Sequence, residues 1–142
     1  MKKTAASLLV CIFLIQVFSP MAFAATESNA YINEYGAGLS NPSSNVIQVD
    51  FHVYGTGYMS SLGANIIYLY EDGALLAMFS RYNPAYTSYM MATNSYRFFG
   101  SISYPAKPGS TYYAIVTFFA TDGYGTGTEG CTTGTLTIPS SP

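Results

Sequence analysis

The sequence predicts an all-β fold, an antiparallel Greek-key β-sandwich of about seven strands. In several short segments apolar and polar residues alternate with a period of two, as in strands with one buried face. Turn-forming residues separate these segments at intervals of about 8–12 residues, the spacing typical of antiparallel sandwiches. After residue 24 no ten-residue stretch has the periodicity of an amphipathic helix, so alternating strand–helix units are not expected.

Residues 1–24 have the three parts of a secretory signal peptide. Lys2 and Lys3 form the positively charged start, residues 8–18 form the apolar centre, and Ala22-Phe23-Ala24 is a small-x-small cleavage site. A membrane anchor is the alternative, but the apolar centre is only about half as long as a membrane span. We therefore expect cleavage after Ala24, secretion from a bacterial cell, and no membrane span in the secreted protein.

Residues 25–142 form a single expected domain, with core strands from about residue 46 to residue 138. Three basic and seven acidic residues give this part of the chain a net charge of −4. Nucleic-acid binding needs a basic surface that matches the phosphates, so no nucleic-acid partner is expected.

Two segments before the middle of the chain are predicted to be strands. Val46–Tyr54 alternates cleanly between apolar and polar residues, and we expect Gly55-Thr56-Gly57 to end it. An earlier strand around Ala30–Leu39 shows a weaker version of the same pattern.

A β-hairpin is predicted next. Ile66–Glu71 and Ala74–Arg81 are apolar runs separated only by Asp72-Gly73. Asp-Gly between two such runs indicates a type I′ turn, because both of its central residues need positive φ angles. A long irregular connection is expected after the hairpin, from Tyr82 to Ser95.

The last third of the chain predicts three more strands. Tyr96–Tyr104 is followed by a proline-containing turn, and Tyr112–Thr121 has the clearest alternation, with residues 112, 114, 116, 118 and 120 on one face. Asp122–Gly130 is expected as a glycine-rich loop, and Thr132–Ile138 as a threonine-rich final strand.

Pro108-Gly109-Ser110-Thr111-Tyr112 resembles the entry to strand F of fibronectin type III and related immunoglobulin-like sandwiches. This resemblance implies that Tyr112 is a structural tyrosine corner, whose hydroxyl bonds back to the backbone just upstream. The chain is also similar to small uncharacterised secreted domains of Gram-positive bacteria, through Gly55-Thr56-Gly57, Met90-Met91 and the strand from Tyr112 to Phe118. The similarity covers about residues 46–138 and implies a fold and a compartment, but no specific activity.

No catalytic residues, metal or cofactor are expected. A serine triad needs a histidine base, and His52 is the only histidine; it follows Asp50 on the polar face of its strand. The Gly-x-Ser-x-Gly motif is absent. One histidine and one cysteine after residue 24 are too few for a zinc site.

Other candidate motifs have simpler explanations. Glu71 and Asp72 are adjacent carboxylates, but they belong to the predicted hairpin, where solvated turn residues are common. Asp122 and Glu129 match no known calcium loop. Gly125–Gly130 fits the string GxGxxG, but the helix that dinucleotide binding requires does not follow it.

Cys131 is the single cysteine after residue 24, so the secreted chain has no intramolecular disulfide. We expect a free thiol, buried on a strand as a small hydrophobic residue. An intermolecular disulfide and a reactive thiol are the alternatives.

Tyrosines are the candidate binding residues, because tyrosine combines a rigid apolar ring with a polar tip. The long connection is favoured as their location, since loops of this length often carry function. The alternative is that β-strands simply favour tyrosine and threonine. The candidate surface consists of Tyr82, Tyr86, Tyr89 and Tyr124.

These observations predict a secreted, non-enzymatic binding or surface-interaction module, whose partner is an unidentified glycan or protein outside the cell. The first alternative is a self-associating extracellular structural protein, because low charge and open strand edges favour strand addition between copies. A small hydrolase is a less favoured alternative.

Overall fold

The computed structural model of the chain describes residues 29–140, so the predicted signal peptide at 1–24 lies outside the described residues. The described part contains seven strands, all paired in antiparallel fashion, and the predicted all-β fold is confirmed. The elements are β1 (Ile32–Ser43), β2 (Val46–Glu71), β3 (Ala74–Ser80), α2 (Thr87–Met90), β4 (Met91–Pro105), β5 (Thr111–Thr121), β6 (Thr126–Thr132) and β7 (Leu136–Thr137).

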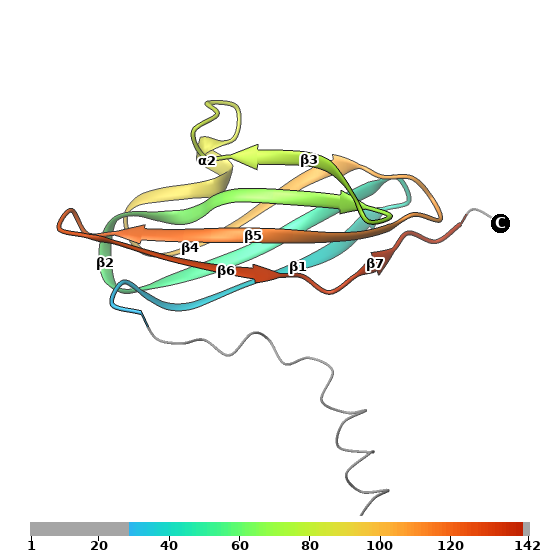
Figure 1. Cartoon of the computed structure of the whole chain (residues 1–142). Coiled ribbons are helices and arrows are strands. Elements are labelled where there is room, and N and C mark those ends of the chain that lie inside the picture. Colours follow the sequence, from blue (N-terminus) through green and yellow to red (C-terminus); the bar gives the residue numbers. More distant parts are fainter. Residues whose placement is uncertain (1–28, 141–142) are drawn as a thin grey trace, which may run out of the picture.

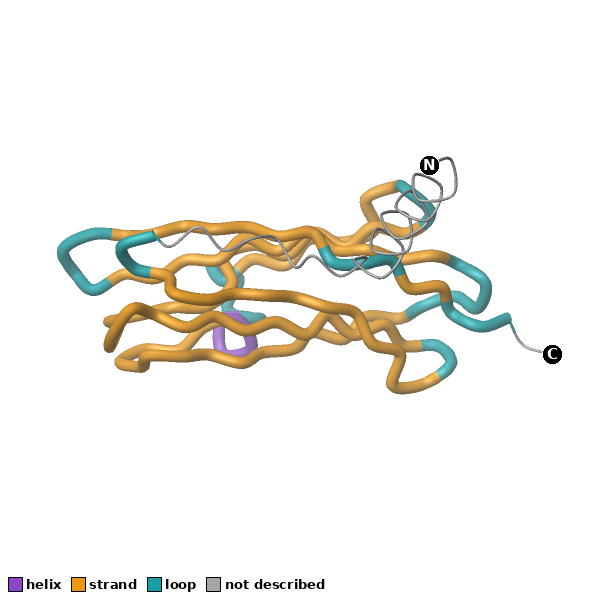
Figure 2. The backbone as a smooth tube through the Cα atoms, turned by 90° about the horizontal axis from the view of Figure 1, so that it is seen from below, coloured by secondary structure: helices purple, strands orange, loops and turns teal. Residues whose placement is uncertain are grey.

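The strands form two layers that face each other (Figures 1 and 2). In the first layer, the first half of β2 lies between β1 and β4. In the second layer, the second half of β2 lies between β3 and β5, and β5 also pairs with β6 and β7. Because β2 runs through both layers, the seven strands belong to one curled sheet.

The core lies between the layers and follows the predicted alternation. Residues 47, 49, 51 and 53 of β2 and residues 112, 114, 116, 118 and 120 of β5 are all buried. Phe118 joins the layers, with its ring centre 5.4 Å from that of Tyr35 and 6.5 Å from that of Phe51. Burial of these inward-facing side chains removes apolar surface from water, which stabilises the sandwich.

The prediction that Gly55-Thr56-Gly57 ends a strand is wrong, because β2 continues through this segment. The pairing of β2 with β4 shifts register between Tyr54 and Met59, which marks a bulge. The backbone N–H of Thr56 still donates a 3.0 Å hydrogen bond to the carbonyl of Tyr31. Glycines in a bulge let a strand bend, so β2 continues past this segment and changes layers further on, where residues 61–63 pair with both β4 and β5.

The hairpin between β2 and β3 forms as predicted. Asp72 and Gly73 have φ angles of 48° and 84°, the positive values that a type I′ turn needs. The Asp72 carboxylate also accepts a 3.0 Å hydrogen bond from the backbone N–H of Thr111, which ties this turn to the start of β5.

The expected irregular connection from Tyr82 to Ser95 is shorter than predicted. The short helix α2 occupies residues 87–90, and β4 begins at Met91. Residues 91–95 pair with β2 between Met59 and Gly63, so backbone hydrogen bonding extends the strand into a segment without clear alternation.

The expected glycine-rich loop from Asp122 to Gly130 is also shorter than predicted. The turn spans only residues 122–125, where the Asp122 carboxylate accepts hydrogen bonds from the N–H groups of Tyr124 (2.8 Å) and Gly125 (3.1 Å). From Thr126 onward the chain pairs with β5 as β6. The predicted last strand at 132–138 is correspondingly reduced to the short β7.

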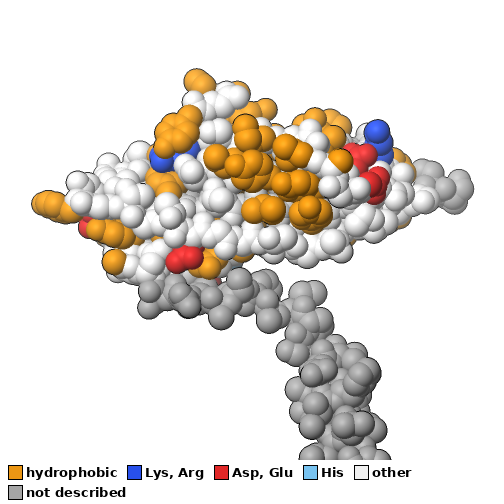
Figure 3. All heavy atoms as spheres, viewed as in Figure 1, with side chains coloured by type: hydrophobic (Ala, Val, Ile, Leu, Met, Phe, Trp, Pro, Cys, Tyr) orange, Lys and Arg blue, Asp and Glu red, His pale blue; other side chains and the backbone are white. Residues whose placement is uncertain are grey.

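The outer surfaces of the two layers differ in character. Figure 3 shows apolar side chains gathered on the outer surface of the second layer. On the first layer, alternation along β2 places polar and aromatic residues outward, opposite its buried residues.

Candidate functional site

The outward residues of the first layer form rows across three strands. His52 of β2 lies between Gly36 of β1 and Phe99 of β4. In the next row Asp50 lies between Gly38 and Ser101. Each row therefore combines one polar side chain with a glycine on one side; the His52 ring lies over Gly36, whereas the surface over Gly38 is open.

A shallow groove of about 690 Å³ crosses these rows and reaches α2. Gly38 on β1 leaves part of its floor open, since a β-carbon there would have no neighbouring atom within 4 Å. The groove is lined by Gly36, Ala37, Gly38, Asp50, Phe51, His52, Ser88, Tyr89, Phe98, Phe99, Gly100 and Ser101.

A chain of hydrogen bonds fixes the carboxylate of Asp50 in the groove. Its two oxygens accept bonds from the Ser40 hydroxyl (2.7 Å) and from the Gln48 amide nitrogen (2.6 Å). The Gln48 amide oxygen in turn accepts a 3.3 Å bond from the Ser103 hydroxyl. Hydrogen bonds to an ionised carboxylate are strong, so they hold Asp50 in one orientation.

Aromatic rings form the other part of the groove. The His52 ring centre lies 6.0 Å from those of Tyr54 and Phe99, and these two rings meet edge to face at 5.6 Å. Phe99 is 58% exposed and Tyr89 is 61% exposed, so both rings offer apolar surface to a ligand. Nε2 of His52 also lies 3.4 Å from Oε1 of Glu34, a residue of β1.

The structure brings only one of the four predicted binding tyrosines, Tyr89, into the groove. Tyr86 is half-buried and packs edge to face on Phe79 at 5.2 Å, as part of the core. Tyr82 is exposed, and its hydroxyl accepts a 2.6 Å bond from Arg81. Tyr124 is 97% exposed in the turn between β5 and β6, at an end of the molecule (Figure 1).

Sequence reasoning did not select Phe99 or Asp50 as binding residues, and it considered His52 only for catalysis. The signal was present, because all three fall on outward positions of alternating segments. What the sequence did not supply was the pairing of β1, β2 and β4, which makes these positions neighbours.

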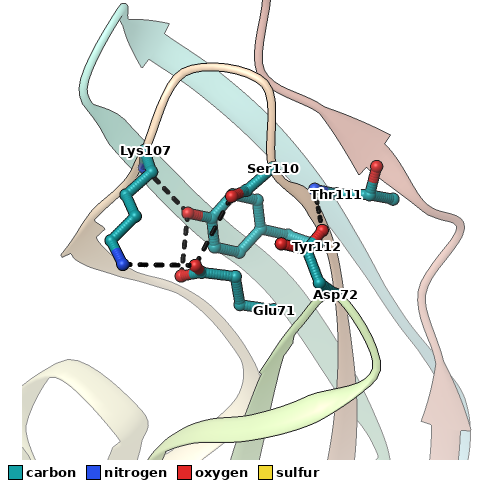
Figure 4. Close-up of polar contacts among 6 residues, drawn as sticks. All are labelled: Glu71, Asp72, Lys107, Ser110, Thr111 and Tyr112. Carbon is teal, nitrogen blue, oxygen red and sulfur yellow. Dashed lines mark hydrogen bonds and ion pairs between the residues drawn. The ribbon is translucent and has the colours of Figure 1, made fainter.

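Tyr112 makes the bond expected of a tyrosine corner (Figure 4). Its hydroxyl accepts a 2.8 Å hydrogen bond from the backbone N–H of Lys107 and donates a 3.1 Å bond to Glu71. Burial raises the pKa of Tyr112, the Lys107 bond lowers it, and the Glu71 carboxylate raises it further. Ser110 and the Lys107 ammonium also contact Glu71, at 3.4 Å and 3.8 Å, so the cluster fixes the turn before β5.

Cys131 is a free thiol on β6, half-buried and opposite Val116 of β5. Burial raises the pKa of this thiol, and a hydrogen bond with the Ala37 backbone acts in the opposite direction. The neutral form is therefore favoured, as for a small hydrophobic residue.

Within residues 29–140, no group of three or more potential metal-binding side chains is present. In the same range, no helix has the length and apolar character needed to cross a membrane. No protein-family model, curated protein or solved structure matches the chain.

Proposed function

We propose that this protein is a secreted, non-enzymatic bacterial β-sandwich that binds an extracellular ligand in the groove of the first layer. The observation that carries this proposal is the combination of an oriented carboxylate, Asp50, with the exposed rings of Phe99 and Tyr89 in one concave surface. Binding sites commonly combine apolar walls with a few fixed polar groups that set ligand orientation.

The chemistry of the groove suits a neutral glycan. The C–H faces of a sugar ring are apolar and can lie against an aromatic ring, while its hydroxyls can donate hydrogen bonds to a carboxylate. Phe99 and Tyr89 supply the rings, and Asp50 and Ser101 supply polar contacts. The shallow, open form of the groove suits a segment of a longer polymer better than a small molecule, which needs deeper enclosure.

Several contacts favour binding over catalysis. A serine hydrolase needs a hydroxyl beside its histidine base. On this face, Ser40 and Ser103 donate to Asp50 and Gln48, while His52 lies against Glu34. These polar groups are bound to one another, which favours a rigid recognition surface.

We further propose that the protein is related to fibronectin type III and other immunoglobulin-like sandwiches. The pairing order supports this, with β1, β2 and β4 in one layer and β3, β2, β5 and β6 in the other. The bond from Lys107 to Tyr112 is a second supporting feature.

The test is a glycan array followed by isothermal titration calorimetry of the glycans that bind. Phe99→Ala is expected to weaken binding by about fivefold to a hundredfold, because an exposed aromatic anchor contributes about 1–3 kcal/mol. Tyr124→Ala is the matched control, since it removes an exposed ring outside the groove. Equal affinity of the Phe99→Ala variant and the unmodified protein would contradict the proposed site.

A further inference from the structure

The outer surface of the second layer carries an apolar patch (Figure 3). The groove lies on the outer surface of the first layer, on the other side of the sandwich. Register places its residues side by side on β3, β2 and β5. Leu75 and Met78 on the edge strand β3 are both 56% exposed. The apolar patch consists of Ile66, Tyr68, Tyr70, Leu75, Met78, Tyr113 and Ile115.

The apolar patch is ordered and continuous. Tyr70 and Tyr113 stack with their ring centres 4.6 Å apart and their planes within 3° of parallel. Leu75 is the β3 neighbour of Tyr70, and Met78 lies beside Tyr68 in the same sheet. Contiguous exposed apolar surface of this kind marks an interaction site in secreted and other water-soluble proteins.

Charges of opposite sign lie at the two ends of the apolar patch. Arg81 follows β3 at one end, where its guanidinium carbon lies 3.6 Å above the centre of the Phe119 ring and its Nε donates a 2.8 Å bond to Asn65. Asp72, in the turn between β2 and β3, lies at the other end. The neighbouring Glu71 carboxylate points instead into the Tyr112 cluster, where the Lys107 ammonium lies 3.8 Å away, so Asp72 is the acidic residue of this end.

We propose that a second copy of this chain packs on the apolar patch, with its strands running in the opposite direction. A twofold axis between the two faces, perpendicular to the strands, places β3 over β3. Each Arg81 then approaches the acidic turn of the other copy. The same pair of opposite charges therefore forms twice, once in each half of the interface. A symmetric dimer requires this self-complementarity.

The charge pattern favours a second copy over a lipid surface. Binding to anionic membranes needs a cluster of basic residues around an apolar surface. Here the two ends of the apolar patch carry Arg81 on one side and Asp72 on the other. These charges complement each other between copies and give no net attraction to an anionic membrane.

Dimerisation through the second layer leaves both grooves on the outside, facing in opposite directions. This consequence rests on the proposed binding function, whereas the dimer does not. Two grooves on one particle can engage two sites of a repetitive polymer, and linked sites raise the apparent affinity well above that of one site. Phe99→Ala is therefore expected to weaken ligand binding without changing the dimer.

The mass of the purified protein in solution tests the dimer. Size-exclusion chromatography with light scattering is expected to show twice the mass of the chain at about 100 μM, a concentration at which an interface of about 6–7 kcal/mol is largely occupied. Leu75→Lys with Met78→Lys is expected to give a monomer, because both side chains are exposed and their replacement does not disturb the core. Tyr124→Lys, an equally exposed change outside the apolar patch, should remain a dimer.

The orientation of the two copies has its own test. Asp72→Asn keeps an oxygen for the Thr111 bond but removes the charge, and it should weaken the dimer by about twofold to fivefold. Asp122→Asn is the matched control, because Asp122 also holds a turn through its carboxylate but lies outside the apolar patch. Equal dimer affinity in the Asp72→Asn and Asp122→Asn variants would overturn the antiparallel arrangement.

Two outcomes would overturn the dimer itself. The first is a monomeric mass for the unmodified protein up to about 1 mM, which would place any self-affinity below about 4 kcal/mol. The second is a monomer that sediments with phosphatidylglycerol vesicles only while Leu75 and Met78 are intact, which would assign the apolar patch to lipid. In either case a groove that still binds glycan would leave the proposed function standing.

Discussion

The imidazole of His52 lies against Gly36, its neighbour across the β1–β2 pairing. A β-carbon at position 36 would lie 2.7 Å from Cε1 of His52, closer than two carbon atoms can approach. The position of the ring in the groove thus depends on the absence of a side chain on β1. Gly36 shapes the candidate site without contributing any functional group to it.

Gly36→Ala is expected to displace the His52 ring and weaken glycan binding by about tenfold, with little loss of stability because His52 is only half-buried. The imidazole signals in nuclear magnetic resonance spectra should shift in the free protein. Gly38→Ala is the matched control, since its methyl group would have no neighbour within 4 Å. An imidazole signal that does not move in the Gly36→Ala variant would show that the glycine does not set the ring position.

Tyr112→Phe is expected to destabilise the fold by about 1–2 kcal/mol, because it removes the acceptor of the Lys107 N–H and a donor to Glu71. Urea unfolding monitored by circular dichroism measures this change. Tyr113→Phe provides the comparison, since Tyr113 lies next in sequence but stacks on Tyr70 on the outer surface. Similar losses in the two variants would argue against a structural role for the Tyr112 hydroxyl.

Gly63→Ala should lower the free energy of unfolding by about 2–3 kcal/mol. At this position β2 pairs with both β4 and β5, and a β-carbon would overlap the Met90 carbonyl oxygen and lie 2.6 Å from Cα of Met91. Backbone atoms cannot move aside as a flexible side chain can. Gly57→Ala, also on β2 but with no neighbour within 4 Å, is expected to change stability little, and thermal unfolding of both variants makes the comparison.

Cys131 should make stability fall in alkaline solution. Burial raises the pKa of its thiol in the folded state, so the folded protein resists loss of the proton more than the unfolded chain does. This contribution is fully present below the unfolded thiol pKa of about 8.5 and is lost as the pH rises through the higher folded value. Urea unfolding across this range should show a steeper alkaline decline for the unmodified protein than for Cys131→Ala, and parallel curves would contradict the assignment.

The layers of the sandwich follow largely from local sequence patterns. Alternation in Val46–Tyr54 and Tyr112–Thr121 predicts the buried faces correctly, because burial selects every second residue of a strand. Asp72-Gly73 predicts its turn because few residues adopt positive φ angles readily. These features depend only on residues close together in the chain.

Features that depend on distant pairing could not be predicted in the same way. Gly55-Thr56-Gly57 looks like the end of a strand, but β1 and β4 hold β2 through a bulge there. Residues 91–95 lack a clear pattern, yet they complete β4 because backbone bonds to β2 are available. The groove could not be predicted from the sequence for the same reason, since only the pairing of three strands brings Gly36, His52 and Phe99 into one row.

The most direct test of the proposed function is a nuclear magnetic resonance titration of the purified protein with the neutral oligosaccharides that bind on the array. If the groove is the binding site, we expect saturable chemical-shift changes concentrated at Gly36, His52, Tyr89 and Phe99, and no change at Tyr124. Shifts confined to the apolar patch or the β5–β6 turn would place the site elsewhere. No binding and no shifts across a broad panel of neutral glycans would contradict glycan binding by this protein.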